Sequence, residues 1–171
     1  MSLTMYESSI PLLVRSLNNL SAILTKGASY ASEKDIDGSV LVNARLFPNM
    51  FALARQVQIA CDVSKGAAAR LSGIEAPAHE DNEASFEELQ TRITNTLKFL
   101  ESIPADKVDG TEDKEIILQA GPKEFKFSGK SYLQTFVMPN VFFHITTAFN
   151  ILRHNGVEIG KMDFLGVPQD K

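Results

Sequence analysis

Apolar side chains recur at helical spacing over the first part of the chain, residues 3–31. The spacing alternates between four and three residues, which is the stripe of an amphipathic helix; its members are Tyr6, Ile10, Leu13, Leu17, Leu20 and Leu24. Pro11 is best accommodated near a helix start, so Ser8 or Ser9 is a candidate N-cap, preceded by a looser turn. The pattern therefore predicts a first long helix.

A second helical pattern covers residues 48–71. Pro48 would occupy its first position, and Gly73 lies just beyond its end. Its apolar face carries mostly small side chains: Met50, Ala54, Val57, Cys61, Ser64, Ala68 and Leu71. Small residues let a neighbouring backbone approach closely, so we expect this helix to pack against the bulkiest helix of the chain. The preceding residues 32–47 are interpreted as a connection with one helical turn.

A third helix follows a linker, residues 74–84, that is rich in acidic and small residues. Ser85 and Glu88 have the spacing of a capping box, in which each side chain bonds to the other residue's free backbone N–H. The apolar positions that follow are Phe86, Leu89, Ile93, Leu97 and Leu100, and Pro104 ends the helix.

The period changes from helical to alternating over residues 115–127. Ile116 and Leu118 alternate with polar residues, as do Phe125 and Phe127, around a Gly121-Pro122 turn. This pattern predicts a two-stranded ribbon. A lone ribbon is only marginally stable in water, so we expect it to lie on the helices or against a partner.

The most apolar helical pattern runs from Ser131 to Asn155. Ser131 and Gln134 have capping-box spacing, Pro139 is expected to kink the helix, and Asn155-Gly156 is a stop signal. One face carries Leu133, Val137, Asn140, His144, Ala148 and Ile151, while bulky residues cover much of the remainder. A helix that is apolar nearly all round is expected to be the buried central one. The tail is expected to fold back over the helices through Val157, Ile159, Phe164 and Leu165.

These elements predict an all-α fold. Four long helices form a four-helix bundle, with a small β-ribbon in the connection between the third and fourth. A length of 171 residues is enough for one hydrophobic core, so we expect a single domain over residues 1–171.

Composition narrows the classes of partner. The formal net charge of −4 argues against the basic surface of a nucleic-acid-binding protein. There is no uninterrupted run of 18 apolar residues, so we expect no membrane span. The first residues lack the basic lead and apolar core of a secretory signal, and a single cysteine, Cys61, fits a reducing compartment. We therefore expect a cytoplasmic protein.

His144 is the main candidate for chemistry, because it is a polar ring inside an apolar helix and needs a buried partner. It is either a hydrogen-bonded core residue or part of a pocket with Gln56 and Asp62 between the helices. His154 lies ten residues further along, about 15 Å away along the axis, so the two rings cannot share one ion. His79 is expected to be exposed in the polar linker. Cys61 is expected to be a small buried residue, and no phosphate-binding or serine-nucleophile motif is present.

Three stretches together resemble a family of uncharacterised bacterial and fungal proteins within the DinB/YfiT-like four-helix-bundle superfamily: PNVFFHITTAFNILRHNGVEIGKMDFLG, ARQVQIACDVSKGAAARLSG and HEDNEASFEELQTRI. The resemblance covers nearly the whole chain. It implies the superfamily's bundle, with a long connection between the second and third helices, and a homodimer.

The resemblance also implies a test for metal. Many superfamily members bind a divalent metal through one histidine on the second helix and an HxxxH pair on the fourth, and some are thiol-dependent S-transferases. His144 matches the first histidine of that pair, but Ala148 stands at the second position and residues 48–73 contain no histidine. The resemblance therefore implies a degenerate or lost metal site.

The leading hypothesis is a pocket around His144 that binds a small polar or aromatic molecule, with no cofactor. Its candidate ligand-binding residues are His144, Gln56, Asp62, Asn140 and Arg92. The alternative is a transferase or hydrolase that uses a divalent metal, Ni or Zn, held by His144 with carboxylates such as Asp62 or Glu83. A third possibility is an interaction protein that pairs with another chain through its ribbon.

Overall fold

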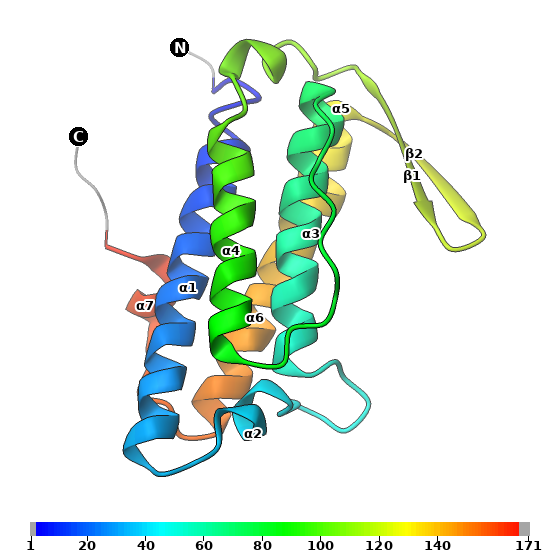
Figure 1. Cartoon of the computed structure of the whole chain (residues 1–171). Helices are drawn as coiled ribbons and strands as arrows, with labels where there is room; N and C mark the ends of the chain where they lie inside the picture. The colour runs from blue at the N-terminus through cyan, green and yellow to red at the C-terminus, as the bar shows by residue number, and fades with distance from the viewer. Residues whose placement is uncertain (1–2, 168–171) are drawn as a thin grey trace.

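The computed structural model describes residues 3–167 and is a four-helix bundle (Figure 1). The long helices are α1 (Ile10–Glu33), α3 (Leu53–Ser72), α4 (Phe86–Glu101) and a composite fourth helix, whose main part is α6 (Met138–His154). Helix α3 packs against α6 and α4, and α1 packs against α4 and α6, which closes the bundle. The predicted all-α fold and the predicted pairing of the second helix with the fourth are confirmed.

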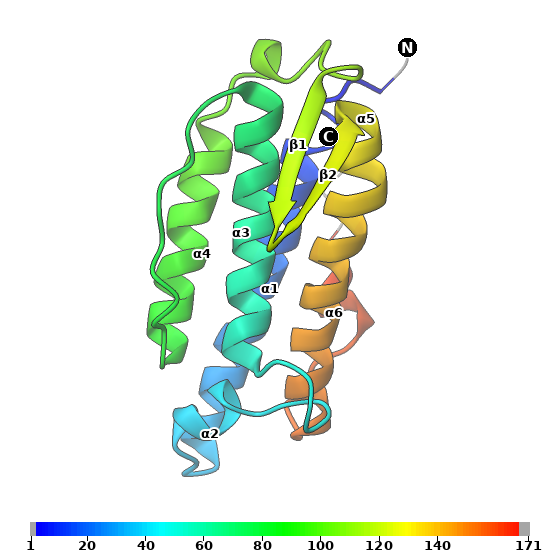
Figure 2. The same ribbon diagram turned by 90° about the vertical axis from the view of Figure 1, so that its right-hand side faces the viewer.

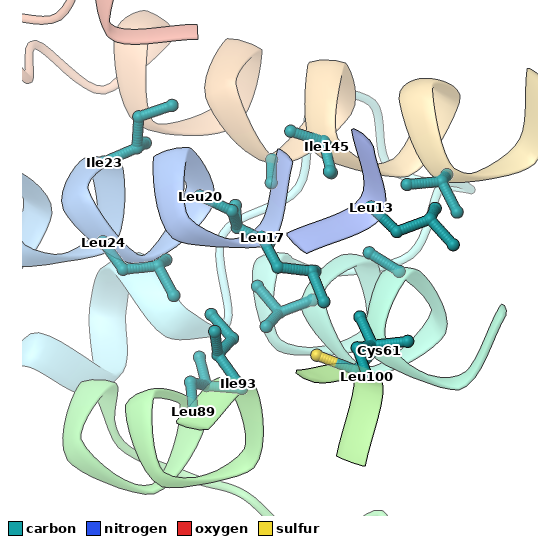
Figure 3. Close-up of a cluster of buried hydrophobic side chains, with 14 of the residues drawn as sticks. Leu13, Leu17, Leu20, Ile23, Leu24, Cys61, Leu89, Ile93, Leu100 and Ile145 are labelled. Atoms are coloured by element: carbon teal, nitrogen blue, oxygen red, sulfur yellow. The ribbon is translucent and has the colours of Figure 1, made fainter. Parts of the chain in front are cut away.

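The core lies along the axis between the four helices (Figure 3). Leucines of α1 meet Cys61 from α3 and apolar residues of α4, all of them almost fully buried: Leu13, Leu17, Leu20, Leu24, Leu89, Ile93 and Leu100. Burial of aliphatic side chains from every long helix is the main force that holds such a bundle together.

Three short helices lie outside this core. The turn α2 (Gly38–Val42) sits in the connection between α1 and α3, η1 (Ala105–Lys107) follows α4, and α7 (Lys161–Leu165) packs on α1. The C-terminal segment folds back as expected, with Val157 and Ile159 buried, although Leu165 is 43% exposed.

Two helix starts differ from the sequence prediction. Helix α1 begins at Ile10, with Pro11 in its first turn, and residues 5–9 form turns. Helix α3 begins at Leu53 rather than Pro48, because Pro48 instead occupies the second position of a turn closed by a 2.9 Å bond from Met50 N–H to the Phe47 carbonyl. Residues 45–52 therefore form a loop beside the end of α3. Helix α4 begins with the predicted Ser85–Glu88 capping box.

The fourth long helix is continuous but irregular. It starts as α5 (Gly129–Ser131), widens to the π-helical turn η2 (Tyr132–Val137), and continues as α6. Ser128, not Ser131, is the N-cap, since its hydroxyl accepts a bond from Ser131 N–H at 3.2 Å. The π turn directly precedes Pro139, which has no N–H to donate and clashes with a regular preceding turn. The disturbance expected from Pro139 therefore takes the form of this π turn.

The fourth helix is less buried than its apolar pattern predicts, since the Phe143 side chain is 57% exposed. By length and mean hydropathy alone, the segment Gly129–His154 could cross a membrane, but 44% of its most apolar window is buried against the other helices. Core helices of bundles share this composition, so it is weak evidence for a span.

The predicted ribbon is confirmed. Strand β1 (Glu115–Ala120) pairs antiparallel with β2 (Lys123–Ser128), with Ile116 opposite Phe127. The ribbon projects from the bundle (Figure 1) and, in the view of Figure 2, lies in front of α3 and the fourth helix. Its base is anchored by aromatic contacts, because the Phe127 ring lies 5.8 Å from that of Tyr132.

Candidate functional site

His144 projects from α6 toward α3 and meets Gln56 there. The imidazole Nδ1 lies 2.7 Å from Gln56 Oε1, and the Gln56 amide nitrogen donates to the Phe51 carbonyl at 3.0 Å. Both side chains are buried, with exposed fractions of 9% for His144 and 1% for Gln56. The buried partner that the sequence required for His144 is therefore Gln56.

This pair of bonds defines which nitrogen of His144 carries the proton. The amide group of Gln56 donates to a backbone carbonyl, so its oxygen must face the imidazole and can only accept. Nδ1 consequently carries the hydrogen, and Nε2 holds the lone pair. The tautomer is assigned from the bonding partners.

Burial lowers the pKa of His144 below its usual value of 6.5, and the positive charge of Arg55 acts in the same direction. The ring is therefore neutral at neutral pH. A neutral imidazole with its proton held at Nδ1 offers Nε2 as a hydrogen-bond acceptor, a base or a metal ligand.

A small cavity adjoins this pair. It has a volume of about 180 Å³ and is lined by Asn49, Met50, Phe51, Gln56 and Phe143. The Phe143 ring stands edge-on to the imidazole, with the ring centroids 5.2 Å apart. Phe51 and Phe143 are 55% and 57% exposed, which is unusual for two neighbouring aromatic side chains of this size. The wall of the cavity is thus aromatic, and its floor is the polar Gln56.

Asn140 lies on α6 one turn before His144 and is half-buried. Among residues 3–167, no hydrogen bond of its side chain amide is found. It is on the same helix face as His144, as the sequence predicts, but it does not line the cavity.

Asp62 and Arg92 belong to a second polar cluster between α3 and α4. The Arg92 guanidinium, 1% exposed, lies 2.8 Å from Asp62 Oδ1, 2.9 Å from Asp81 Oδ1 and 2.8 Å from Glu83 Oε1. Burial alone would lower the pKa of Arg92, but the Glu83 hydrogen bond and the Asp62 and Glu83 charges outweigh burial and raise it. Arg92 is a permanent cation that three carboxylates neutralise.

The cluster fastens the linker of residues 74–84 to the bundle. Gln58 of α3 donates to Glu83 at 2.9 Å, and Arg55 pairs with Asp81. Burial would raise the pKa of Glu83, yet the hydrogen bond from Arg92 holds it below its usual range. Because two linker carboxylates bind cations on two helices, the main role of this cluster is structural.

His79 was expected to be exposed, and the structure corrects this. The side chain is half-buried next to the Arg92 cluster, and its Nδ1 is one of two buried polar atoms without a hydrogen-bond partner in the described chain, the other being Arg92 Nε. Burial, together with the charges of Lys65 and Arg92, lowers the pKa of His79.

The two clusters use different faces of α3. Gln56 and Asp62 are six residues apart, which separates them by about 9 Å along the helix and about 120° around it. Gln56 therefore faces α6 while Asp62 faces α4. The structure brings together His144 and Gln56, and separately Asp62 and Arg92, but it does not join the two pairs.

The residues near His144 do not fit the three-histidine metal site that the resemblance implies. Ala148 occupies the next helical turn, Gln56 takes the Nδ1 side of the ring, and α3 has no histidine. Asp62 and Glu83, the carboxylates considered as substitutes, are bound to Arg92. Over residues 3–167, no group of three or more His, Cys, Asp or Glu side chains is placed to hold one ion.

Cys61 is not an activated thiol. Burial raises its pKa to about 12, an effect only partly offset by a hydrogen bond with Thr96. A protonated, fully buried thiol is a poor nucleophile. The expectation that Cys61 is a small buried residue is confirmed.

Sequence reasoning missed the aromatic wall of the cavity and the linker carboxylate Asp81. Phe51 was assigned to a helix because Pro48 is compatible with a helix start as well as with a turn. The signal that could have found this loop was the Phe47-Pro48-Asn49 sequence, which has the composition of a tight turn. No signal in the sequence identified Asp81 as a partner of Arg92.

Comparison with known proteins agrees with this fold. A family profile described as "Domain of unknown function (DUF1993)" matches residues 5–165. The crystal structure of a DinB family member protein from Shewanella denitrificans is 39% identical, covers 97% of this chain and 94% of its own, and superposes with a TM-score of 0.88. No curated protein matches the sequence.

Proposed function

We propose that this chain, which belongs to the DUF1993 family of uncharacterised DinB-like proteins, binds a small organic molecule at the cavity beside His144. The observation that carries the proposal is the Gln56–His144 hydrogen bond, which holds a neutral imidazole in a single tautomer at the edge of an aromatic-walled cavity. In this proposal the superfamily's metal site is degenerate, and His144 serves as a hydrogen-bond acceptor.

The chemistry of the cavity restricts the ligand. The exposed faces of Phe51 and Phe143 favour a flat or apolar body, and Nε2 of His144 favours a hydroxyl or N–H donor on that body. A volume of about 180 Å³ suits a single-ring compound rather than a nucleotide or a peptide. Asn140, one turn away, is available for a second polar contact.

Asp62 and Arg92 take an indirect part. They hold Asp81, and Asp81 in turn pairs with Arg55, the residue next to Gln56. The Arg92 cluster is therefore a positioning group for the end of α3 that carries the ligand-binding glutamine. A metal-dependent reaction through His144, Asp62 and Glu83 would first require both carboxylates to leave Arg92, and no observation favours this alternative.

A matched pair of probes tests the proposal. Phenol has a ring and a hydroxyl donor, whereas anisole has the same ring with the donor methylated. We expect phenol to shift the amide resonances of residues 49–56 and 140–148 in a ¹H–¹⁵N spectrum, and anisole to bind about tenfold more weakly because it cannot donate to Nε2. Equal affinities for the two probes, or shifts elsewhere in the protein, would contradict the proposal.

The variant His144→Ala should abolish the preference for phenol, and His154→Ala is its matched control. His154 lies on the same helix but in its last turn, away from the cavity. If both variants kept the preference for phenol, His144 would not be the acceptor.

A further inference from the structure

The ribbon has a free edge on β2. Within residues 3–167 the sheet consists of β1 and β2 alone, so the outer edge of β2 has no strand beside it. An unpaired edge offers a row of backbone N–H and C=O groups to another strand. The tip of the ribbon stands away from the helices, which leaves room for a neighbour (Figure 1).

The turn determines which backbone groups point to this edge. Gly121 and Pro122 form a two-residue loop, so the closing pair Ala120–Lys123 is hydrogen-bonded and the pairs alternate from there. Phe125, opposite Leu118, consequently bonds to β1. The N–H and C=O groups of Glu124 and Lys126 point outward.

The side chains along this edge are self-complementary. Glu124 and Lys126 flank Phe125, so an antiparallel copy of β2 centred on Phe125 places Glu124 opposite Lys126 of the partner subunit, and does so twice. The same register also sets the outward backbone groups of Glu124 and Lys126 opposite one another. Both charged side chains are well exposed, and Phe125 is 43% exposed.

We propose that the outer edge of β2 is a self-association surface, on which β2 of a second copy adds antiparallel to form a four-stranded sheet across a two-fold axis. A second copy is the occupant because a two-fold interface must be complementary to itself, and the Glu-Phe-Lys sequence meets that condition. The outer edge of β1 offers Ile117 but no such pair of opposite charges, since Glu115 would face Gln119. This proposal does not depend on the His144 cavity.

Charge reversal with rescue tests the surface. Glu124→Lys and Lys126→Glu each place like charges opposite one another at two points, so we expect the dissociation constant of the dimer to rise about tenfold in sedimentation-equilibrium measurements. The double variant E124K/K126E restores opposite charges at both points and should associate like the wild type. Gln119→Lys, on the outer edge of β1, is the matched control and should leave association unchanged.

Several results would overturn the proposal. These are a wild-type protein that stays monomeric as its concentration is raised, a dimer that none of the substitutions affects, a dimer that Gln119→Lys but not Glu124→Lys dissociates, and single variants that the double variant fails to rescue. All substituted side chains are exposed, so folding of each variant can be verified by circular dichroism before association is measured.

Discussion

Gln56 holds His144 in one tautomer: its side-chain oxygen accepts from Nδ1 of the imidazole at 2.7 Å, and its amide is held in place by the Phe51 carbonyl. In proteins with a histidine ligand or base, the ring nitrogen that does not react is usually oriented in this way by a second side chain. Here the orienting residue survives while the other metal-ligand positions are filled by residues such as Ala148. This combination favours a binding role for Nε2 over metal chemistry.

Replacing the acceptor by a charge should change the titration of His144. The variant Gln56→Glu places a carboxylate at Nδ1, which stabilises the protonated ring, and we expect the pKa of His144 to rise by about 1–3. The measurement is the pH dependence of the His144 Cε1–H resonance. An unchanged titration curve would show that the two side chains are not in contact in solution.

His144 should also contribute to the pH dependence of stability. Its pKa in the folded protein lies below the value of 6.5 in the unfolded chain, so the unfolded state binds more protons between the two values. The contribution is fully present above pH 6.5 and is lost as the pH falls toward the folded-state pKa. We expect His144→Phe to flatten the slope of unfolding free energy in that window, measured by urea denaturation at several pH values. His79 has a lowered pKa as well, so His79→Phe provides the comparison.

Metal content separates the proposed function from its alternative. We expect protein purified without chelator to contain well below one metal ion per chain by mass spectrometry, and Ni²⁺ or Zn²⁺ titrations to give no stoichiometric step. The reason is that His144 has no second and third ligand among the described residues. About one ion per chain in the wild type, absent from His144→Ala, would instead support the metal-dependent enzyme.

Removal of Arg92 should destabilise the protein strongly. The variant Arg92→Met leaves the carboxylates of Asp62, Asp81 and Glu83 without their buried cation, and we expect a loss of about 3 kcal/mol in the free energy of unfolding. The control is Lys26→Met, which breaks an exposed pair with Asp163 and should cost less than about 1 kcal/mol. Similar losses in the two variants would mean that the cluster does not anchor the linker.

Gly129 is expected to tolerate no side chain. A Cβ at this position would lie 2.0 Å from the Thr111 carbonyl oxygen, which is part of the backbone and cannot rotate away. We expect Gly129→Ala to lower the free energy of unfolding by about 1–3 kcal/mol. Gly160→Ala is the control, because no atom lies within 4 Å of a Cβ there.

The sequence predicted those features that depend on neighbouring residues. The Ser85–Glu88 capping box and the Gly121-Pro122 hairpin are both decided within a few residues, and both are confirmed. The start of α3 was placed too early because Pro48 suits two local structures. A distant contact decides between them, namely the bond from Leu53 N–H to the Ala44 carbonyl.

The site was predictable in part for the same reason. Periodicity placed Gln56 and His144 on apolar helix faces, where each polar group needed a partner, and they are each other's partner. Periodicity could not show that Asp62 turns toward Arg92, since that depends on the phase of α3 relative to both neighbours. The linker carboxylates that complete the Arg92 cluster have no periodicity at all.

The π-helical turn Tyr132–Val137 has a consequence for the orientation of everything after it. Such a turn holds one residue more than a regular α-helical turn, and each residue rotates the following helix by about 100°. Deleting a single residue there would let the helix become regular, but it would rotate His144 away from Gln56 and carry Phe143 to a different neighbour. The aim of the imidazole is thus set more than a full turn away, at a bulge held between the base of the ribbon and Pro139, so the spacing of residues 132–137 matters to the cavity even though none of them lines it.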